Sequence, residues 1–171
     1  GLGDVYKRQV LMIDGAGHGA PAAAVVEAGR KVFDQHCDDD IVRLMTTVHR
    51  ALAPTRGGAA AIARVDTRER LVRFVGIGNI SAAIIHEGVA KRMVSHNGVA
   101  GHVAPRIREF TYPWHPGDAV ILHSDGLSAK WDMADYPGLA LSHPSLIAGI
   151  LFRDHRRPKD DASVVVMAGP Q

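Results

Sequence analysis

Residues 10–19, with the sequence VLMIDGAGHG, leave few options for the local fold. The first four residues are apolar and predict a short buried strand, and Asp14 follows where that strand ends. The glycines after Asp14 let backbone carbonyl groups come close to a ligand. Carboxylate and carbonyl oxygens are the ligands that hard divalent cations prefer in proteins. The stretch therefore predicts a cation site at the end of a strand.

Two further acidic segments lie far along the chain, each beside an apolar run. Residues 124–126 (SDG) follow one such run, and residues 160–163 (DDAS) precede another. Carboxylates at three separate strand ends are the donor set that a hydrolytic site with two metal ions needs. The hypothesis depends on whether the fold brings the three strand ends together.

Composition restricts the class of protein. The 171 residues fit one domain with a buried core, 46% of them are hydrophobic, and 22% are charged. The net charge of +2 is too small to indicate nucleic acid or a membrane surface as a partner. The single cysteine, Cys37, excludes an internal disulfide framework and fits a reducing compartment, so we expect a cytoplasmic protein. We find neither a signal peptide nor an apolar run of about 20 residues, the length that spans a membrane.

Two helices are predicted near the start of the chain. Residues 20–36 are rich in alanine, and Pro21 fits the first turn of a helix. The acidic triplet at 38–40 is better explained as the cap of a second helix than as a metal site. The apolar stripe of that second helix consists of Ile41, Leu44, Met45, Val48 and Leu52.

From residue 57 onward the hydrophobic period is that of strands. The predicted strands are residues 59–65 paired with 71–75, 81–85 paired with 91–94, then 106–112 and 119–123. A helix at 144–151, capped by Ser142, and a strand at 163–168 follow. This order indicates an α+β layered fold. Residues 1–9 show no clear periodicity, so we place the functional domain at 10–171.

Five motifs occur in a characteristic order. They are DGAGHG at 14–19, GIGN at 76–79, SHNGVAGH at 95–102, GDAVILHSDGL at 117–127 and DDASVVVM at 160–167. Each motif alone is weak, but the ordered set resembles the SpoIIE-type branch of the PPM metal-dependent serine/threonine protein phosphatases. The resemblance covers nearly the whole chain after residue 9. It implies an α+β sandwich of two mainly antiparallel β-sheets flanked by helices.

The resemblance also implies roles for particular residues. Asp14 would bridge two Mn²⁺ or Mg²⁺ ions, and the Gly15 carbonyl would ligate one of them. Asp125 and Asp160 would hold the other ion. The implied reaction is direct in-line attack by a water that the two metal ions activate, without a covalent enzyme intermediate. Cys37 is therefore not expected to act as a nucleophile.

The chain departs from the family pattern in two places and leaves one assignment open. Many members carry a strand with a Gly-Asp signature before the first motif, and here only residues 3–4 offer that pair. The sequence leaves open whether this strand is present; its absence would expose a sheet edge. Asn79 stands where some members have an aspartate for a third ion, so we expect two ions. Asp161 follows Asp160 directly, and we assign the ligand to the first by motif position.

Several other side chains suggest roles near the site. His18 is either a general acid that protonates the leaving seryl oxygen or a residue that orders the glycine turn. The loop around Asn97 and Gly98 matches the family loop and is expected to help position the substrate. The basic run at 153–159 is either a solvated loop or a surface that steers an anionic substrate. The ten histidines show no zinc-binding spacing, so zinc is not predicted.

The leading hypothesis is a Mn²⁺- or Mg²⁺-dependent phosphoserine/phosphothreonine protein phosphatase in a regulatory switch. The resemblance implies a phosphorylated STAS-type anti-anti-sigma protein as substrate and an anti-sigma-type kinase domain as a further partner. The alternative is a catalytically inactive domain of the same fold that binds a phosphoprotein. A two-metal nuclease is disfavoured, because the chain has little net charge and no basic stripe.

Overall fold

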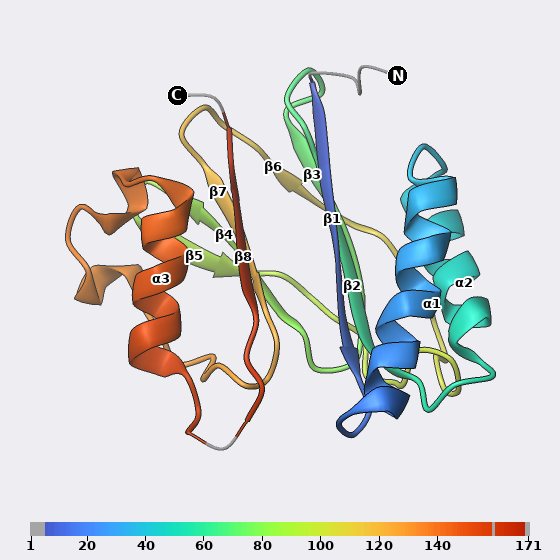
Figure 1. The fold of residues 1–171 in the computed structure, drawn as a ribbon. Coiled ribbons are helices and arrows are strands. Elements are labelled where there is room, and N and C mark those ends of the chain that lie inside the picture. Colours follow the sequence, from blue (N-terminus) through green and yellow to red (C-terminus); the bar gives the residue numbers. More distant parts are fainter. Residues whose placement is uncertain (1–5, 159, 170–171) are drawn as a thin grey trace.

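The computed structural model describes residues 6–158 and 160–169, which form two β-sheets packed face to face with helices on both outer faces (Figure 1). Each sheet has four strands, in the orders β1-β2-β3-β6 and β5-β4-β7-β8, and all neighbouring strands are antiparallel. The prediction of an α+β sandwich of two antiparallel sheets flanked by helices is therefore confirmed.

The elements have the following bounds. The first sheet contains β1 (Lys7–Gly15), β2 (Gly58–Asp66), β3 (Leu71–Ile77) and β6 (Phe110–Pro113). The second contains β4 (Ser81–His86), β5 (Val89–Arg92), β7 (Ala119–His123) and β8 (Val164–Ala168). The helices are α1 (Ala20–His36), α2 (Ile41–Leu52) and α3 (Pro144–His155), with short 3₁₀ turns η1 (Met133–Asp135) and η2 (Leu139–Leu141).

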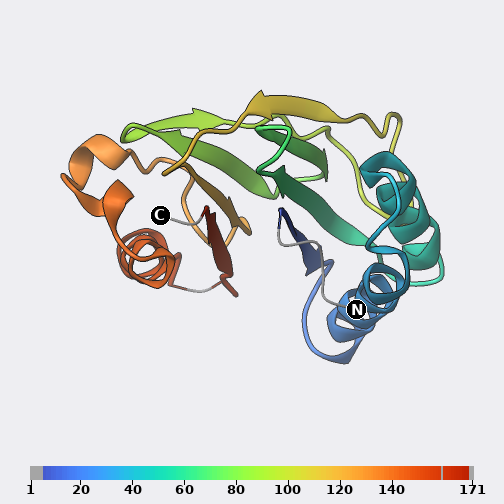
Figure 2. The ribbon, with the colours of Figure 1, turned by 90° about the horizontal axis from the view of Figure 1, so that it is seen from above.

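Three apolar cores hold the layers together. Successive side chains along a strand point to opposite faces of the sheet, so they belong to different cores. On β2, Ala60 and Ile62 face α1 and α2, whereas Ala61 and Ala63 face the second sheet. The third core lies between the outer face of the second sheet and α3 with its neighbouring turns. Figure 2 shows the resulting four layers, with α1 and α2 on one side and α3 on the other. The small alanine side chains of β2 allow close packing on both of its faces.

Both edges on one side of the sandwich are formed by single strands from opposite ends of the chain. β1 and β8 are edge strands of their sheets and lie next to each other in both views (Figures 1 and 2). The Arg8 side chain donates a 2.6 Å hydrogen bond to the Ala168 carbonyl, which links the two edges. β1 begins at Lys7, three residues before the predicted start. The Gly-Asp pair at residues 3–4 lies outside the described residues.

Three details of the predicted elements are wrong. The strand predicted at 91–94 is β5, which ends at Arg92. Strand β6 begins at Phe110, not at Arg106, because it pairs only with the first half of β3. Beyond that point His96 bridges Ile77 at the same edge of β3, so residues 106–109 have no strand to pair with. The cap of α3 is His143, whose ring nitrogen accepts a hydrogen bond from the Ser145 N–H, and not Ser142.

The second helix agrees with its prediction. The Asp40 carboxylate accepts hydrogen bonds from the N–H groups of Val42 and Arg43, which caps the helix. All five residues of the predicted apolar stripe are buried. None of the helices in the described part of the chain combines the length and apolar character of a membrane span.

Candidate metal centre

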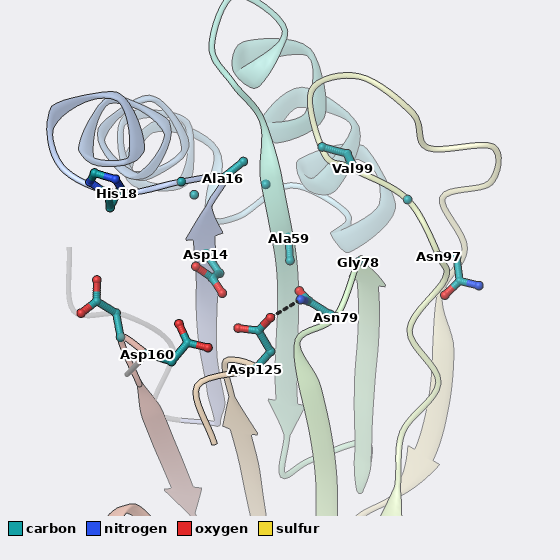
Figure 3. A pocket seen from close by; sticks show the side chains of 15 residues that line it. Asp14, Ala16, His18, Ala59, Gly78, Asn79, Asn97, Val99, Asp125 and Asp160 are labelled. Carbon is teal, nitrogen blue, oxygen red and sulfur yellow. Dashed lines mark hydrogen bonds between the residues drawn. The ribbon is translucent and has the colours of Figure 1, made fainter. Parts of the chain in front are cut away.

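A polar cavity of about 880 Å³ opens at one end of the sandwich, and four carboxylates line it (Figure 3). Asp14 comes from the end of β1, and Asp125 follows β7. Asp160 and Asp161 lie in the segment before β8. The other residues that line the cavity are Gly15, Ala16, Gly17, His18, Gly58, Ala59, Gly78, Asn79, Asn97, Gly98 and Val99. Carboxylates from both ends of the chain thus face one space.

Glycines bring the chain segments of this site close together. Gly58 pairs with Gly15 across β1 and β2, and a Cβ atom on Gly58 would overlap with the Asp14 carbonyl. A Cβ atom on Gly126 would overlap with the Asp161 carbonyl. Any side chain at either position would push a backbone segment that carries an acidic residue away from the cavity.

Ser124 connects the end of β7 to the segment before β8. The Ser163 N–H donates a 3.0 Å hydrogen bond to the Ser124 hydroxyl, and the Ser124 N–H donates one of 3.0 Å to the Ser163 carbonyl. These bonds hold Asp125 beside the acidic pair that precedes Ser163. No local pattern indicates this role of Ser124, because its contact partner lies 39 residues further along the chain.

The acidic side chains repel one another. The pKa of Asp14 is raised from 3.8 to about 6, first by burial, then by the negative charge and contact of Asp125, and then by the charges of Asp160 and Asp161. Divalent cations would relieve this repulsion, and a donor set made of oxygens suits Mn²⁺ or Mg²⁺. The acidic residues present therefore fit a site for these ions.

Asn79 orients one of the acidic groups. Its side-chain amide donates a 2.6 Å hydrogen bond to Asp125 Oδ2, the dashed line in Figure 3. In the structure, Asn79 thus contacts a carboxylate that is a proposed metal ligand. The GIGN motif marks this position in the sequence, but only the fold reveals which carboxylate it contacts.

The other expected site residues lie around the cavity. Gly15 and His18 line it, and the His18 ring is exposed at its rim without a hydrogen bond to another described residue. Asn97 lies on the opposite side of the cavity from His18 (Figure 3). The basic residues Arg153, Arg156 and Arg157 do not line the cavity, and residue 159 lies outside the described residues.

The chain resembles known proteins in sequence and in fold. A profile of the family Stage II sporulation protein E (SpoIIE) matches residues 7–168. The chain belongs to the SpoIIE family. It is 22% identical over 117 residues to the phosphoserine phosphatase RsbX of Bacillus subtilis (strain 168). The aligned part is 67% of this chain and 58% of RsbX, so the chain spans less than two thirds of that relative.

Solved structures agree with the family assignment. One of them is a structure from work on the bacterial stressosome, a modular system adapted to control secondary messenger signaling. It matches with a TM-score of 0.83 and 26% sequence identity, and the match covers 94% of this chain and 84% of that chain. The structure of RsbX in complex with magnesium matches with a TM-score of 0.82 and 18% sequence identity, and the match covers 95% of this chain and 81% of that chain. The structure of the RsbU and RsbW domains of Rv1364c from Mycobacterium tuberculosis matches with a TM-score of 0.76 and 17% sequence identity, and the match covers 94% of this chain and 52% of that chain. The chain is a SpoIIE-family domain with a PPM-like fold.

Proposed function

We propose that this domain hydrolyses phosphoserine or phosphothreonine on a regulatory protein, using two Mn²⁺ or Mg²⁺ ions. Asp14, the Gly15 carbonyl, Asp125 and Asp160 would hold the ions. The observation that carries the proposal is the convergence of carboxylates from β1, from the end of β7 and from the segment before β8 on one cavity. Bound cations of this kind lower the pKa of a water molecule and neutralise phosphoryl oxygens.

The protein side chains prepare the site for this chemistry. With a pKa of about 6, Asp14 is largely ionised at neutral pH and available as a ligand. Asn79 keeps the Asp125 carboxylate turned toward the cavity through its hydrogen bond. His18, exposed at the rim, is placed to donate a proton to the seryl oxygen that leaves.

The substrate class follows from the relatives. RsbX is a phosphoserine phosphatase, and one similar structure belongs to the bacterial stressosome. We therefore propose a phosphorylated STAS-type anti-anti-sigma protein as the substrate. The similarity to a structure that contains both an RsbU and an RsbW domain supports an anti-sigma-type kinase domain as a further partner.

The test is hydrolysis of p-nitrophenyl phosphate and of a phosphoserine-bearing STAS protein with and without Mn²⁺. Asp14→Asn and Asp160→Asn should each lower kcat/KM by at least about 100-fold, because each removes a proposed ligand. Asp34→Asn is the matched control, since Asp34 is exposed on α1 and paired with Arg30 far from the proposed ligand set. Its activity should equal that of the wild type.

Three outcomes would contradict the proposal. Turnover that survives in a chelator, or in both active-site variants, would exclude the metal-dependent mechanism. Binding of the phosphorylated STAS protein without turnover would favour an inactive phosphoprotein-binding domain. Cleavage of nucleic acid in the same buffers would identify a different two-metal hydrolase.

A further inference from the structure

A second cluster of metal-ligating side chains lies at the other end of the second sheet. His86 ends β4, and His115 and Asp118 belong to the turn that leads into β7. Along the β4–β7 pair, Ser81 lies opposite His123 near the acidic cavity, whereas Ile85 lies opposite Ala119 at the far end. The cluster is therefore separated from the acidic cavity by the length of these strands.

Three side chains meet in this cluster. His86 Nδ1 lies 2.7 Å from Asp118 Oδ1, and His115 Nδ1 lies 3.3 Å from Asp118 Oδ2. The centroids of the two imidazole rings are 4.4 Å apart. One potential ligand atom from each residue lies within 4.8 Å of the other two. Both oxygens of a single carboxylate thus face an imidazole nitrogen.

A tight turn joins two of the three residues. The His115 N–H donates a 2.8 Å hydrogen bond to Asp118 Oδ2, and the Asp118 N–H donates one of 3.1 Å to the His115 carbonyl. Gly117 between them has a φ of 87°, which favours glycine. Pro116 stiffens the same turn. The turn therefore fixes the Asp118 carboxylate beside His115 before any ion binds.

Burial differs between the carboxylate and the imidazoles. The Asp118 side chain is 2% exposed, whereas those of His86 and His115 are 47% and 48% exposed. A buried carboxylate is costly unless positive charge accompanies it. The imidazole side of the cluster is therefore open to solvent.

We propose that His86, His115 and Asp118 bind a Zn²⁺ ion, with water as the fourth ligand. Two imidazoles, one carboxylate and a water match the tetrahedral nitrogen and oxygen coordination that zinc adopts. Zinc–ligand distances of about 2.0–2.2 Å place neighbouring ligand atoms about 3.3–3.5 Å apart. The observed separations of 2.7 and 3.3 Å need only small rotations of exposed rings to reach this geometry.

The sequence does not predict zinc, because its ten histidines show none of the established spacings of zinc motifs. The relevant spacing here is His115-x-x-Asp118 in a proline–glycine turn, and the third ligand comes from 29 residues earlier in the chain. Only the pairing of β4 with β7 brings His86 to this turn. Protons compete with zinc at His86, since its hydrogen bond to Asp118 raises the pKa of the imidazole.

The test is calorimetric titration with Zn²⁺ at pH 7.5 in excess Mg²⁺, added to compete with Zn²⁺ for the carboxylates of the acidic cavity. The wild type should bind one Zn²⁺ ion at this site, and His86→Asn and His115→Asn should each weaken binding at least tenfold. The matched control is His36→Asn, since His36 pairs with Asp39 on the surface and lacks a third ligand in the described chain. Its Zn²⁺ affinity should equal that of the wild type.

A second measurement keeps the result independent of folding. The melting temperature of the wild type should be higher with Zn²⁺ than in a chelator, and neither histidine variant should show the same rise relative to its own melting temperature in the chelator. Equal Zn²⁺ affinity in the wild type and both variants would overturn the proposal. A zinc-edge anomalous peak in the acidic cavity alone would do the same. The phosphatase assay is unaffected by either variant, so this proposal and the proposed function fail separately.

Discussion

Asp14 is a proposed metal ligand whose pKa is raised by burial and by neighbouring carboxylates. Its pKa of about 6, against an ordinary 3.8, means that the metal-free folded protein holds this proton more tightly than the unfolded chain does. Between about pH 4 and pH 6 the folded state therefore binds more protons, and its stability falls as the pH rises through that range. The site is thus built at a cost in stability that bound cations offset.

We predict that Asp14→Asn stabilises the metal-free protein at neutral and higher pH. The substitution removes a charge that burial and three neighbouring carboxylates disfavour. The gain in unfolding free energy should be about 1 kcal/mol at pH 8, after allowance for solvent screening, and should shrink toward zero near pH 4. Urea denaturation in EDTA at both pH values measures it. A variant less stable than the wild type at pH 8 in EDTA would refute this electrostatic account.

The amide of Asn79 should affect metal binding through Asp125. Asn79→Ala removes the 2.6 Å hydrogen bond that orients the carboxylate, so Mn²⁺ affinity should fall about tenfold. Asn97→Ala serves as the control, because Asn97 lines the same cavity without a hydrogen bond to a described carboxylate. Calorimetry with Mn²⁺ compares the two. If both variants lose affinity equally, the contact with Asp125 is not the cause.

At the scale of elements, the close approach of β7 and β8 depends on Gly126. Gly126→Ala should lower both the unfolding free energy, by about 1–3 kcal/mol, and the metal-dependent activity, because the new methyl group displaces the backbone at Asp161. Gly149→Ala is a matched control on α3, where a Cβ atom meets no neighbour. It should stabilise the protein by about 0.5–1 kcal/mol through helix propensity. Denaturation and phosphatase assays on both variants check the pair, and equal behaviour would contradict the close-packing argument.

Elements governed by local signals could be predicted from the sequence. The aspartate cap and apolar stripe of α2 and the turn at Glu87 and Gly88, both with positive φ, are encoded by neighbouring residues. The start of β6 could not be predicted, because it depends on His96 occupying the β3 edge from a distant part of the chain. The sequence could not distinguish Ser142 from His143 as the cap of α3, because both side chains can accept a hydrogen bond from the first turn of a helix.

For the whole molecule, the ordered motifs predicted the family and the fold, while the contacts within each site needed the structure. The sequence indicates that Asp14, Asp125 and Asp160 follow or precede strands, but only the sheet order β5-β4-β7-β8 beside β1-β2-β3-β6 shows that these strand ends meet. Asp161 lines the cavity beside Asp160, so motif position alone distinguishes their roles. The histidine cluster at the opposite end had no sequence signal.

The most direct measurement is an anomalous difference map from a crystal of the wild-type protein soaked with Mn²⁺. Our account predicts two manganese peaks in the acidic cavity, both within ligand distance of Asp14, with Asp125 and Asp160 around one of them. A map without manganese in this cavity, or with peaks that these aspartates do not contact, would contradict it.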